Sequence, residues 1–202
     1  MRILFLAPWH PYPPDNGSKI RIYHLLRALA QEHEVSLLSF VRDGEVVDSQ
    51  GLKSLCGSVQ TVPWRAYEPR RAKALLGFLS PLPRSVVDTY SQEMDRLVEE
   101  SVSREGWDLV VASELATAPY ALNKRGTHRI LEDVELGAIH DAWERSTSPV
   151  SRWRRGLTWL KKRHYVGDLA RQFDVCTVVS EKERALLSRS APGYGNTYVV
   201  PN

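Results

Sequence analysis

The 202-residue sequence predicts an α/β fold, namely a doubly wound, mainly parallel sheet of about seven strands. Three observations support this prediction. Short apolar segments typical of strands alternate with longer amphipathic segments typical of helices along the whole chain. The connections between successive strands are long enough to contain helices, as right-handed parallel crossovers require. Hydrophobic residues make up 43% and charged residues 25% of the sequence, a balance that supports a buried core.

The first 30 residues show the alternation clearly. An apolar strand is expected at residues 3–7, and a loop containing prolines follows it. A helix is expected to start near Ser18, with Lys19 and Arg21 off its core-facing side. That core-facing side consists of Ile20, Ile22, Tyr23, Leu26, Leu29 and Ala30.

Helices and strands continue to alternate in the rest of the chain. One helix is expected at residues 87–103, and a long helical region at 137–173 is broken near Pro149. Glu181 is expected in the first turn of a helix that Ser180 caps. The remaining strands are expected at residues 34–40, 59–63, 108–113, 128–131, 174–180 and 198–200.

Composition and motifs exclude several classes of protein. There is no Walker A loop, no GxGxxG fingerprint, no zinc-type spacing of Cys and His, and no GxSxG elbow. The formal charge of +3 is too small to indicate nucleic acid, and no aromatic reader motif accompanies it. Cys56 and Cys176 are expected to be buried free thiols. No apolar run approaches about 18 residues, so we expect a cytoplasmic protein.

Two segments, residues 64–84 and 152–164, mix basic residues with bulky apolar ones. The second begins at Arg152 and ends at His164, and contains six Lys or Arg residues as well as two tryptophans. One reading is a packed helix with a solvated basic face. The other is peripheral contact with an anionic membrane surface, at the inner face of the membrane.

Polar side chains follow several of the expected strands. Because the carboxyl ends of parallel strands share one edge of a sheet, these side chains should line one crevice. Glu114 has an alternative reading as a helix first-turn charge, and His10 as part of the loop scaffold. Glu132 and Asp133 follow an apolar strand directly and have no evident packing role. The candidate substrate-binding residues are His10, Asp15, Asn16, Gly17, Ser18, Lys19, Glu114, Glu132 and Glu135, with Asp133 as the catalytic candidate.

Both ends of the chain resemble a known family. The opening, MRILFLAPWHPYPPDNGSKIRIYHLLRALAQEHEVSLLSF, resembles that of group 1 (family 4, retaining) glycosyltransferases of GT-B fold. The segment DVCTVVSEKERALL, followed by TYVVPN, resembles the last strand and helix of their N-terminal domain. The resemblance implies that residues 1–202 form a single Rossmann-like, acceptor-binding N-terminal domain. The C-terminal, donor-binding domain of such enzymes is absent from the sequence.

The resemblance also implies a reaction. A hexosyltransferase of this family moves a sugar from a nucleotide-diphosphate sugar to a glycan or lipid-linked acceptor, as in polysaccharide biosynthesis. No cofactor and no metal are expected, and the fragment alone is expected to be inactive. The backbone at Gly17 and Ser18 would approach the donor diphosphate, where a larger side chain would block it. Glu132 and Asp133 occupy the place of a His-Asp pair in the family.

Two other functions remain open from the sequence. One is half of a GT-B nucleotide-sugar epimerase, which would need no acceptor. The other is a non-catalytic Rossmann-like binding module.

Overall fold

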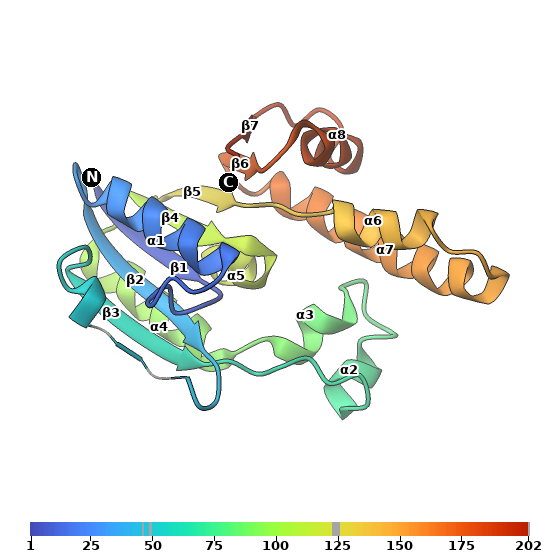
Figure 1. Ribbon diagram of the computed structural model, residues 1–202, viewed down its shortest axis with the longest axis horizontal. Coiled ribbons are helices and arrows are strands. Elements are labelled where there is room, and N and C mark those ends of the chain that lie inside the picture. The colour runs from blue at the N-terminus through green and yellow to red at the C-terminus, as the bar shows by residue number, and fades with distance from the viewer. Residues whose placement is uncertain (46, 49, 123–125, 202) are drawn as a thin grey trace. The chain divides into compact units, whose positions relative to one another are not determined.

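The computed structural model describes residues 1–45, 47–48, 50–122 and 126–201 (Figure 1). These residues form two compact units. Unit 1 contains Met1–Arg65 and Ser91–Glu132, and unit 2 contains Ala66–Tyr90 and Asp133–Pro201. Asn202, at the expected approach to an interdomain linker, lies outside the described residues. That residues 1–202 form a single domain stays a prediction.

All seven expected strands are present, with ends that differ from the prediction by at most two residues. Their apolar content differs, from RILFLA and LVVAS, which are almost wholly buried, to SVQTVP, which is mostly exposed. The strands are β1 (Arg2–Ala7), β2 (Glu34–Val41), β3 (Ser58–Pro63), β4 (Leu109–Ser113), β5 (His128–Glu132), β6 (Val175–Val178) and β7 (Thr197–Val199).

The strands pair in parallel within each unit. Unit 1 holds the order β3-β2-β1-β4-β5, in which Phe5 of β1 lies opposite Leu37 of β2 and Val111 of β4. In unit 2, β6 pairs with β7, and Thr177 lies opposite Tyr198. The central strand β1 is buried from Ile3 onward. The predicted doubly wound, mainly parallel α/β fold of about seven strands is confirmed.

Helices connect these strands. The long helical region is broken before Pro149, as predicted, and the Ser148 side chain caps the second helix by accepting from the Ser151 N–H. Ser180 caps the last helix as expected. The helices are α1 (Gly17–Leu29), α2 (Ala72–Leu76), α3 (Arg84–Thr89), α4 (Gln92–Glu105), α5 (Glu114–Ala121), α6 (Gly137–Glu144), α7 (Pro149–Ala170) and α8 (Glu181–Ser190), with a 3₁₀ turn, η1, at Gln50–Leu52.

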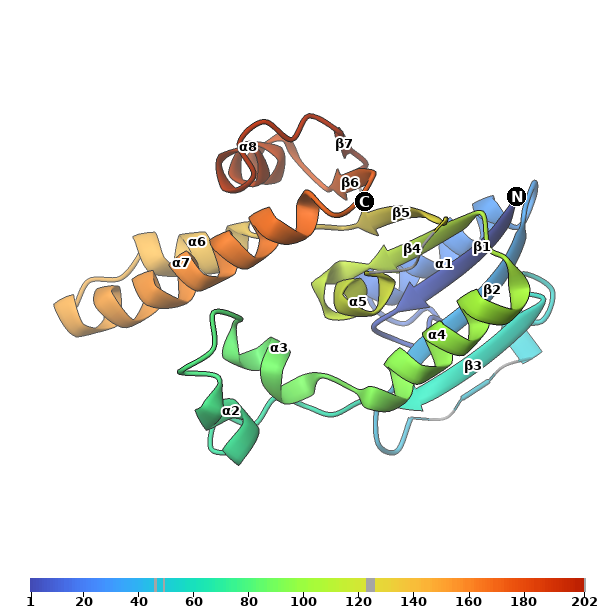
Figure 2. The same ribbon diagram turned by 180° about the vertical axis from the view of Figure 1, so that it is seen from behind.

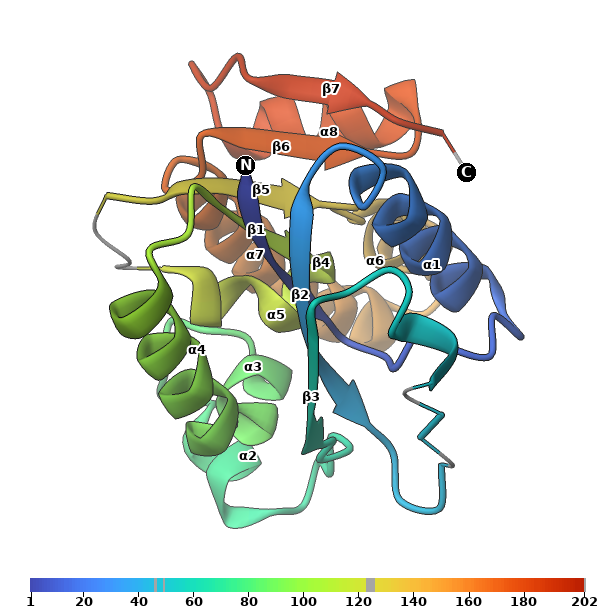
Figure 3. The same ribbon diagram turned by 90° about the vertical axis from the view of Figure 1, so that its left-hand side faces the viewer.

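In unit 1, helices cover both faces of the sheet. Helix α1 lies on one face, and α4 and α5 lie on the other (Figures 2 and 3). Ile22 and Leu26 of α1 are buried against β1, β2 and β4. The expectation for Ile20 is wrong, because its side chain is 44% exposed. Lys19 and Arg21 are buried instead, because each is bound by a carboxylate from another part of the unit.

The prediction of a single helix at residues 87–103 is also wrong. Helix α3 ends at Thr89, and α4 begins at Gln92. Ser91 makes this break, because its side chain accepts a hydrogen bond from the Met94 N–H at 3.2 Å. The backbone N–H of Ser91 donates to the Tyr120 hydroxyl at 2.9 Å. Apolar periodicity continues across the break, which is why the sequence pattern does not reveal it.

Unit 2 is largely helical. Helices α6 and α7 lie side by side in Figures 1 and 2. The His140 ring of α6 packs edge-on against Trp159 of α7, with ring centroids 4.9 Å apart. Among the described residues, no helix combines the length and apolar content that a membrane span needs. Cys56 in unit 1 and Cys176 in unit 2 are buried free thiols, as predicted.

Candidate substrate-binding site

The loop between β1 and α1 ends at a capped helix N-terminus. Asn16 has an extended backbone, and its side-chain oxygen accepts a hydrogen bond from the Lys19 N–H at 3.1 Å. Within the described residues, the N–H groups of Gly17 and Ser18 donate to no protein acceptor. A Cβ added at Gly17 would meet no heavy atom within 4 Å. Two unused donors therefore lie beside open space at the positive end of the helix dipole.

The Lys19 side chain is held by two carboxylates. Its ammonium lies 2.5 Å from a Glu45 oxygen and 3.4 Å from an Asp15 oxygen. Burial alone would lower the pKa of Lys19, but its hydrogen bonds and attraction to Glu45 and Asp15 outweigh burial and raise it. Burial would raise the pKa of Glu45, yet the bond from Lys19 and an N–H from Arg42 lower it. The positive charge of Lys19 is thus neutralised within unit 1.

We expect Glu45→Gln to lower the free energy of unfolding by about 2 kcal/mol, because the buried Lys19 cation then loses the nearer of its two counter-charges among the described residues. The lowered pKa of Glu45 means that its contribution is present above the pKa of an unfolded glutamate, and is lost as pH falls through the lower folded-state pKa. Urea unfolding at pH values from 7 to 3 tests this, because that range includes the pKa of an unfolded glutamate, about 4.3.

The matched control is Asp43→Asn, which removes an exposed carboxylate from the same connection. Equal stability of Glu45→Gln and Asp43→Asn at neutral pH would contradict the role assigned to Glu45.

His10 is fully buried under the same connection. Its Nδ1 lies 3.4 Å from the Ser39 hydroxyl, and its Nε2 lies 3.5 Å from the Asp48 carbonyl oxygen. Burial lowers the pKa of His10 and so favours the neutral imidazole. These contacts hold His10 within the loop, and its predicted role in substrate binding stays a prediction.

A buried cluster joins α1 to the carboxyl ends of β4 and β5. The Arg21 Nε donates to one oxygen of Glu132 at 2.6 Å, and the Ser113 hydroxyl donates to the other oxygen at 2.7 Å. Ser113 and Glu132 are the last residues of β4 and β5, and they lie opposite each other in the sheet. Glu132 therefore has a structural role that its sequence context does not indicate.

Glu114 lies directly after β4 in an uncommon backbone conformation. Its φ of 60° is in the left-handed region, which few residues other than glycine adopt. The Thr117 hydroxyl donates to the Ser113 and Glu114 carbonyl oxygens at 2.6 and 3.2 Å, and so holds this turn. The Trp9 indole N–H donates to a Glu114 carboxylate oxygen at 3.2 Å. A strained residue thus presents a carboxylate beside an aromatic ring.

Trp9 and Trp64 form a half-buried aromatic surface, which we call the Trp9–Trp64 shelf. Their ring centroids are 6.3 Å apart, and Trp64 packs edge-on against Phe40 of β2 at 5.1 Å. The Arg42 guanidinium lies 4.1 Å from the Trp9 ring centroid. Since Trp9 and Trp64 follow β1 and β3, which flank β2 in the sheet, the shelf lies at the carboxyl ends of these strands, with Glu114 at its side. Neither tryptophan is among the site residues that the sequence predicts.

Asp133 and Glu135 belong to unit 2. Asp133 is buried and has a φ of 58°, and its backbone N–H donates to the Thr177 hydroxyl at 3.1 Å. The next N–H, of Val134, donates to the Thr177 carbonyl oxygen. Glu135 is exposed. Asp133 is therefore fixed at the edge of β6 in a strained conformation, as Glu114 is after β4.

The N-terminus of α6 is occupied by a side chain of the protein. The Glu183 carboxylate accepts from the Leu136 N–H at 2.7 Å and from the Gly137 N–H at 2.9 Å. A Cβ on Gly137 would collide with the same carboxylate. A negative group at a helix N-terminus is electrostatically favourable, so this helix end is satisfied internally.

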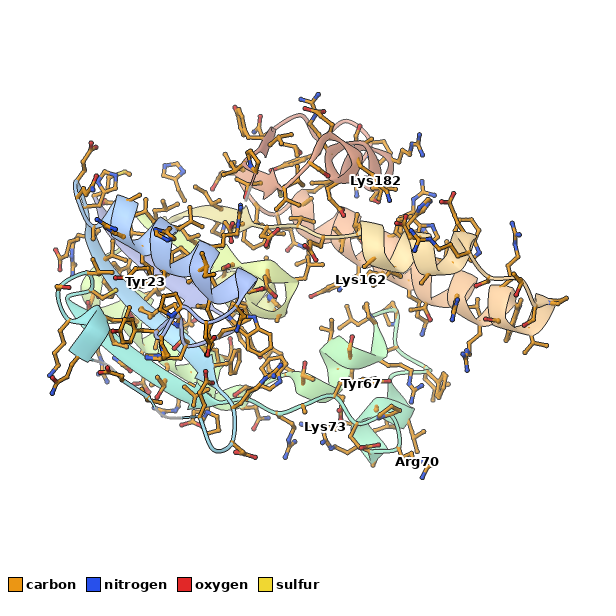
Figure 4. All side chains as sticks on the ribbon, in the orientation of Figure 1. Tyr23, Tyr67, Arg70, Lys73, Lys162 and Lys182 are labelled. Carbon is orange, nitrogen blue, oxygen red and sulfur yellow. The ribbon has the colours of Figure 1, made fainter. Side chains whose placement is uncertain are left out.

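One group of side chains in the described part of the chain has metal-ligand spacing. Ligand atoms of His140, Asp141 and Glu144 all lie within 4.8 Å of one another. The ammonium of Lys182, labelled in Figure 4, already binds both Asp141 oxygens at 2.6 and 2.8 Å. This ion pair lowers the pKa of Asp141. Because the Lys182 ammonium already binds Asp141, this group does not form an open metal site. The expected absence of a metal stays a prediction.

The structure thus sorts the candidate residues into several local groups. Asp15 and Lys19 meet through Glu45, Glu132 meets Arg21 and Ser113, and Glu114 meets Trp9. Asp133 and Glu135 lie in the other unit. Their roles in binding or catalysis stay predictions.

A family model decides the classification. The model described as "Glycosyl transferase 4-like domain" matches residues 16–202. The chain belongs to this family. The resemblance to the N-terminal domain of group 1 glycosyltransferases of GT-B fold, noted from the opening and closing segments, is confirmed.

Solved structures share the fold of this glycosyl transferase 4-like domain. Sucrose-phosphate synthase from Thermosynechococcus elongatus is 16% identical with a TM-score of 0.60, and the match covers 100% of this chain and 48% of the synthase. A Phytolacca americana UGT2 structure, complexed with UDP-2fluoro-glucose and pterostilbene, is 12% identical with a TM-score of 0.53 over 100% of this chain and 53% of that one.

Arabidopsis thaliana UGT89C1 complexed with UDP-L-rhamnose gives 16% identity and a TM-score of 0.51, with 98% of this chain and 48% of that chain covered. This chain therefore spans about half the length of these proteins. At such identities the likeness shows the fold alone. The search of curated proteins found no match.

Proposed function

We propose that this chain is the acceptor-binding half of a retaining glycosyltransferase. The complete enzyme would move a hexose from a nucleotide-diphosphate sugar to a glycan or lipid-linked acceptor. In that transfer the acceptor oxygen bonds to the anomeric carbon, the bond from that carbon to the diphosphate oxygen breaks, and the nucleoside diphosphate takes up the acceptor's proton. Membership of the glycosyl transferase 4-like family supports the reaction class.

The observation that carries this proposal is the open N-terminus of α1. The unused N–H groups of Gly17 and Ser18 suit the oxygens of a diphosphate, and nothing in the chain fills the space beside Gly17. The structures of UGT2 and UGT89C1 contain UDP-sugars, which agrees with a nucleotide-sugar donor here. Lys19 would contribute its charge only after giving up Glu45 or Asp15.

The Trp9–Trp64 shelf supports the acceptor side of the proposal. Tryptophan rings pack against apolar faces of sugars or lipids, and the Glu114 carboxylate can accept a hydrogen bond from an acceptor hydroxyl. The strained backbone of Glu114 fixes its position before the acceptor arrives. Asp133, which is buried with a left-handed backbone, is the candidate for a catalytic group near the reacting sugar.

Binding of inorganic pyrophosphate tests the diphosphate site directly. In a titration followed by amide NMR, we expect the Gly17 and Ser18 signals to shift most. Gly17→Val should weaken pyrophosphate binding at least about tenfold, since its side chain would occupy the space that the anion needs.

The matched control is Gly195→Val, because a Cβ at Gly195 also meets nothing within 4 Å. This control should bind pyrophosphate as the unaltered chain does. Shifts confined to residues far from α1, or unchanged affinity in Gly17→Val, would contradict the proposal.

A further inference from the structure

Helix α7 has two apolar faces on opposite sides. Trp159, Tyr165, Val166 and Leu169 are buried within the protein. A second set with spacings of three and four residues lies on the other side of the helix and is exposed. It consists of Val150, Trp153, Leu157 and Leu160, of which Trp153 is 69% exposed. A surface helix normally has one apolar face, which is buried against the core. The exposed apolar face of α7 therefore requires an explanation.

A second exposed apolar segment lies in the same unit. It runs from the end of α2 through the turn before α3, and Leu79 at its tip is 90% exposed. The members of this segment are Leu75, Leu76, Phe78, Leu79 and Leu82. Large apolar side chains seldom gather in water without a partner.

Lys161 of α7 ties the two segments together. Its ammonium donates to the carbonyl oxygens of Gly77, Phe78 and Ser80 at 3.3, 3.2 and 2.9 Å. All three N–H donors of the side chain can thus be used to hold the turn against α7. Arg84 adds to this, because it donates to the Ala74 carbonyl oxygen and its guanidinium lies 3.8 Å from the Phe78 ring centroid. These hydrogen bonds and the cation–π contact therefore fix the turn that exposes Leu79.

All the charged residues within both segments are basic. The sequence contains no Asp or Glu at residues 69–87 or 149–167. Arg152 and Arg154 are exposed on α7 and form no ion pair in the described part of the chain. Arg70 and Lys73, at the start of α2, are also exposed (labelled in Figure 4). Lys162 does not belong to this group, because burial lowers its pKa to about 8.

We propose that these two segments form a docking surface for an anionic lipid bilayer, which we call the lipid-docking surface. Trp153, Leu157, Leu79 and their apolar neighbours enter the boundary between headgroups and acyl chains. The surrounding arginines and lysines bind anionic headgroups. Charge complementarity decides for an anionic bilayer, since a second copy of this chain would bring the same positive charges together. This proposal is independent of the sugar-transfer reaction.

Sedimentation of the full chain with lipid vesicles tests the lipid-docking surface. We expect binding to phosphatidylcholine vesicles that contain phosphatidylglycerol, weak binding to phosphatidylcholine alone, and loss of binding at high salt. Arg152→Glu combined with Arg154→Glu should reduce the partition coefficient at least about tenfold. Leu79→Glu and Trp153→Glu should each abolish binding, because a charge then replaces the inserted group.

The control is Tyr198→Glu, which places the same charge at an exposed aromatic residue on β7. It should bind vesicles normally, and circular dichroism should show that all the variants fold. The proposal is overturned if Leu79→Glu and Trp153→Glu bind as the unaltered chain does, or if no binding to anionic vesicles occurs. It is also overturned if sedimentation velocity shows a dimer that these two substitutions dissociate, because a second copy would then cover the surface.

Discussion

Arg21→Met is expected to lower the free energy of unfolding by about 3–5 kcal/mol, because it leaves a buried carboxylate without its cation. Arg21 and Glu132 have side chains that are each 7% exposed, and their contact is 2.6 Å long. Among the partners found in the described residues, the Ser113 hydroxyl would remain to stabilise the charge of Glu132. Urea unfolding followed by far-UV circular dichroism measures the loss.

Two further variants separate the ion pair from a general effect of substitution in α1. Arg27→Met removes an exposed arginine from the same helix and should change stability by less than about 0.5 kcal/mol. Arg21→Met combined with Glu132→Leu removes both charges and should recover most of the loss. If the double variant is as unstable as Arg21→Met alone, the uncompensated charge of Glu132 is not the cause.

The same ion pair shows where sequence reasoning reaches its limit. Short apolar segments bounded by polar turns correctly give all seven strands, and this signal is strongest in β1 and β4, which are buried along almost their whole length. Apolar periodicity places Arg21 outside the core, because an isolated arginine favours water. The partner that permits its burial, Glu132, lies 111 residues away in the sequence. A contact at that distance leaves no local pattern.

The candidate site was predictable to a similar degree. The position of Gly17 and Ser18 at the start of a helix follows from a strand, a loop and an Asn cap in the sequence. The left-handed backbone of Glu114 and Asp133 does not, since neither residue is a glycine and the strain is imposed by surrounding structure. In the sequence, Trp9 and Trp64 look like ordinary apolar residues. Their contact exists only in the folded sheet, where the ends of β1 and β3 come near each other.

The lipid-docking surface was only partly predictable from the sequence. The sequence indicates basic and apolar residues at 152–164 but cannot tell which apolar residues are buried. The structure separates Trp159, which is packed inside, from Trp153, which is exposed. It also adds the segment around Leu79, through the three hydrogen bonds of Lys161.

Gly167→Ala is expected to lower the free energy of unfolding by about 3 kcal/mol, because α7 and α8 approach each other at this glycine. An added Cβ would collide with the Ser190 carbonyl oxygen and would lie 2.9 Å from the carbonyl carbon. These are backbone atoms, so the methyl group cannot be accommodated by rotating a side chain. Ser190 is the last residue of α8, and its own hydroxyl is already bonded to the Leu186 carbonyl oxygen at 2.7 Å.

The matched control for this close approach is Gly156→Ala, in the same helix. There the added Cβ would meet the Trp143 ring nitrogen at 3.2 Å, a side-chain atom that can shift. Alanine is favoured over glycine within a helix by about 1 kcal/mol, which offsets that contact. The two variants therefore carry the same change in composition and helix propensity, and differ in whether backbone or side chain stands in the way. Equal urea midpoints for the two would mean that α7 and α8 can separate freely at Gly167, and that the contact does not fix their packing.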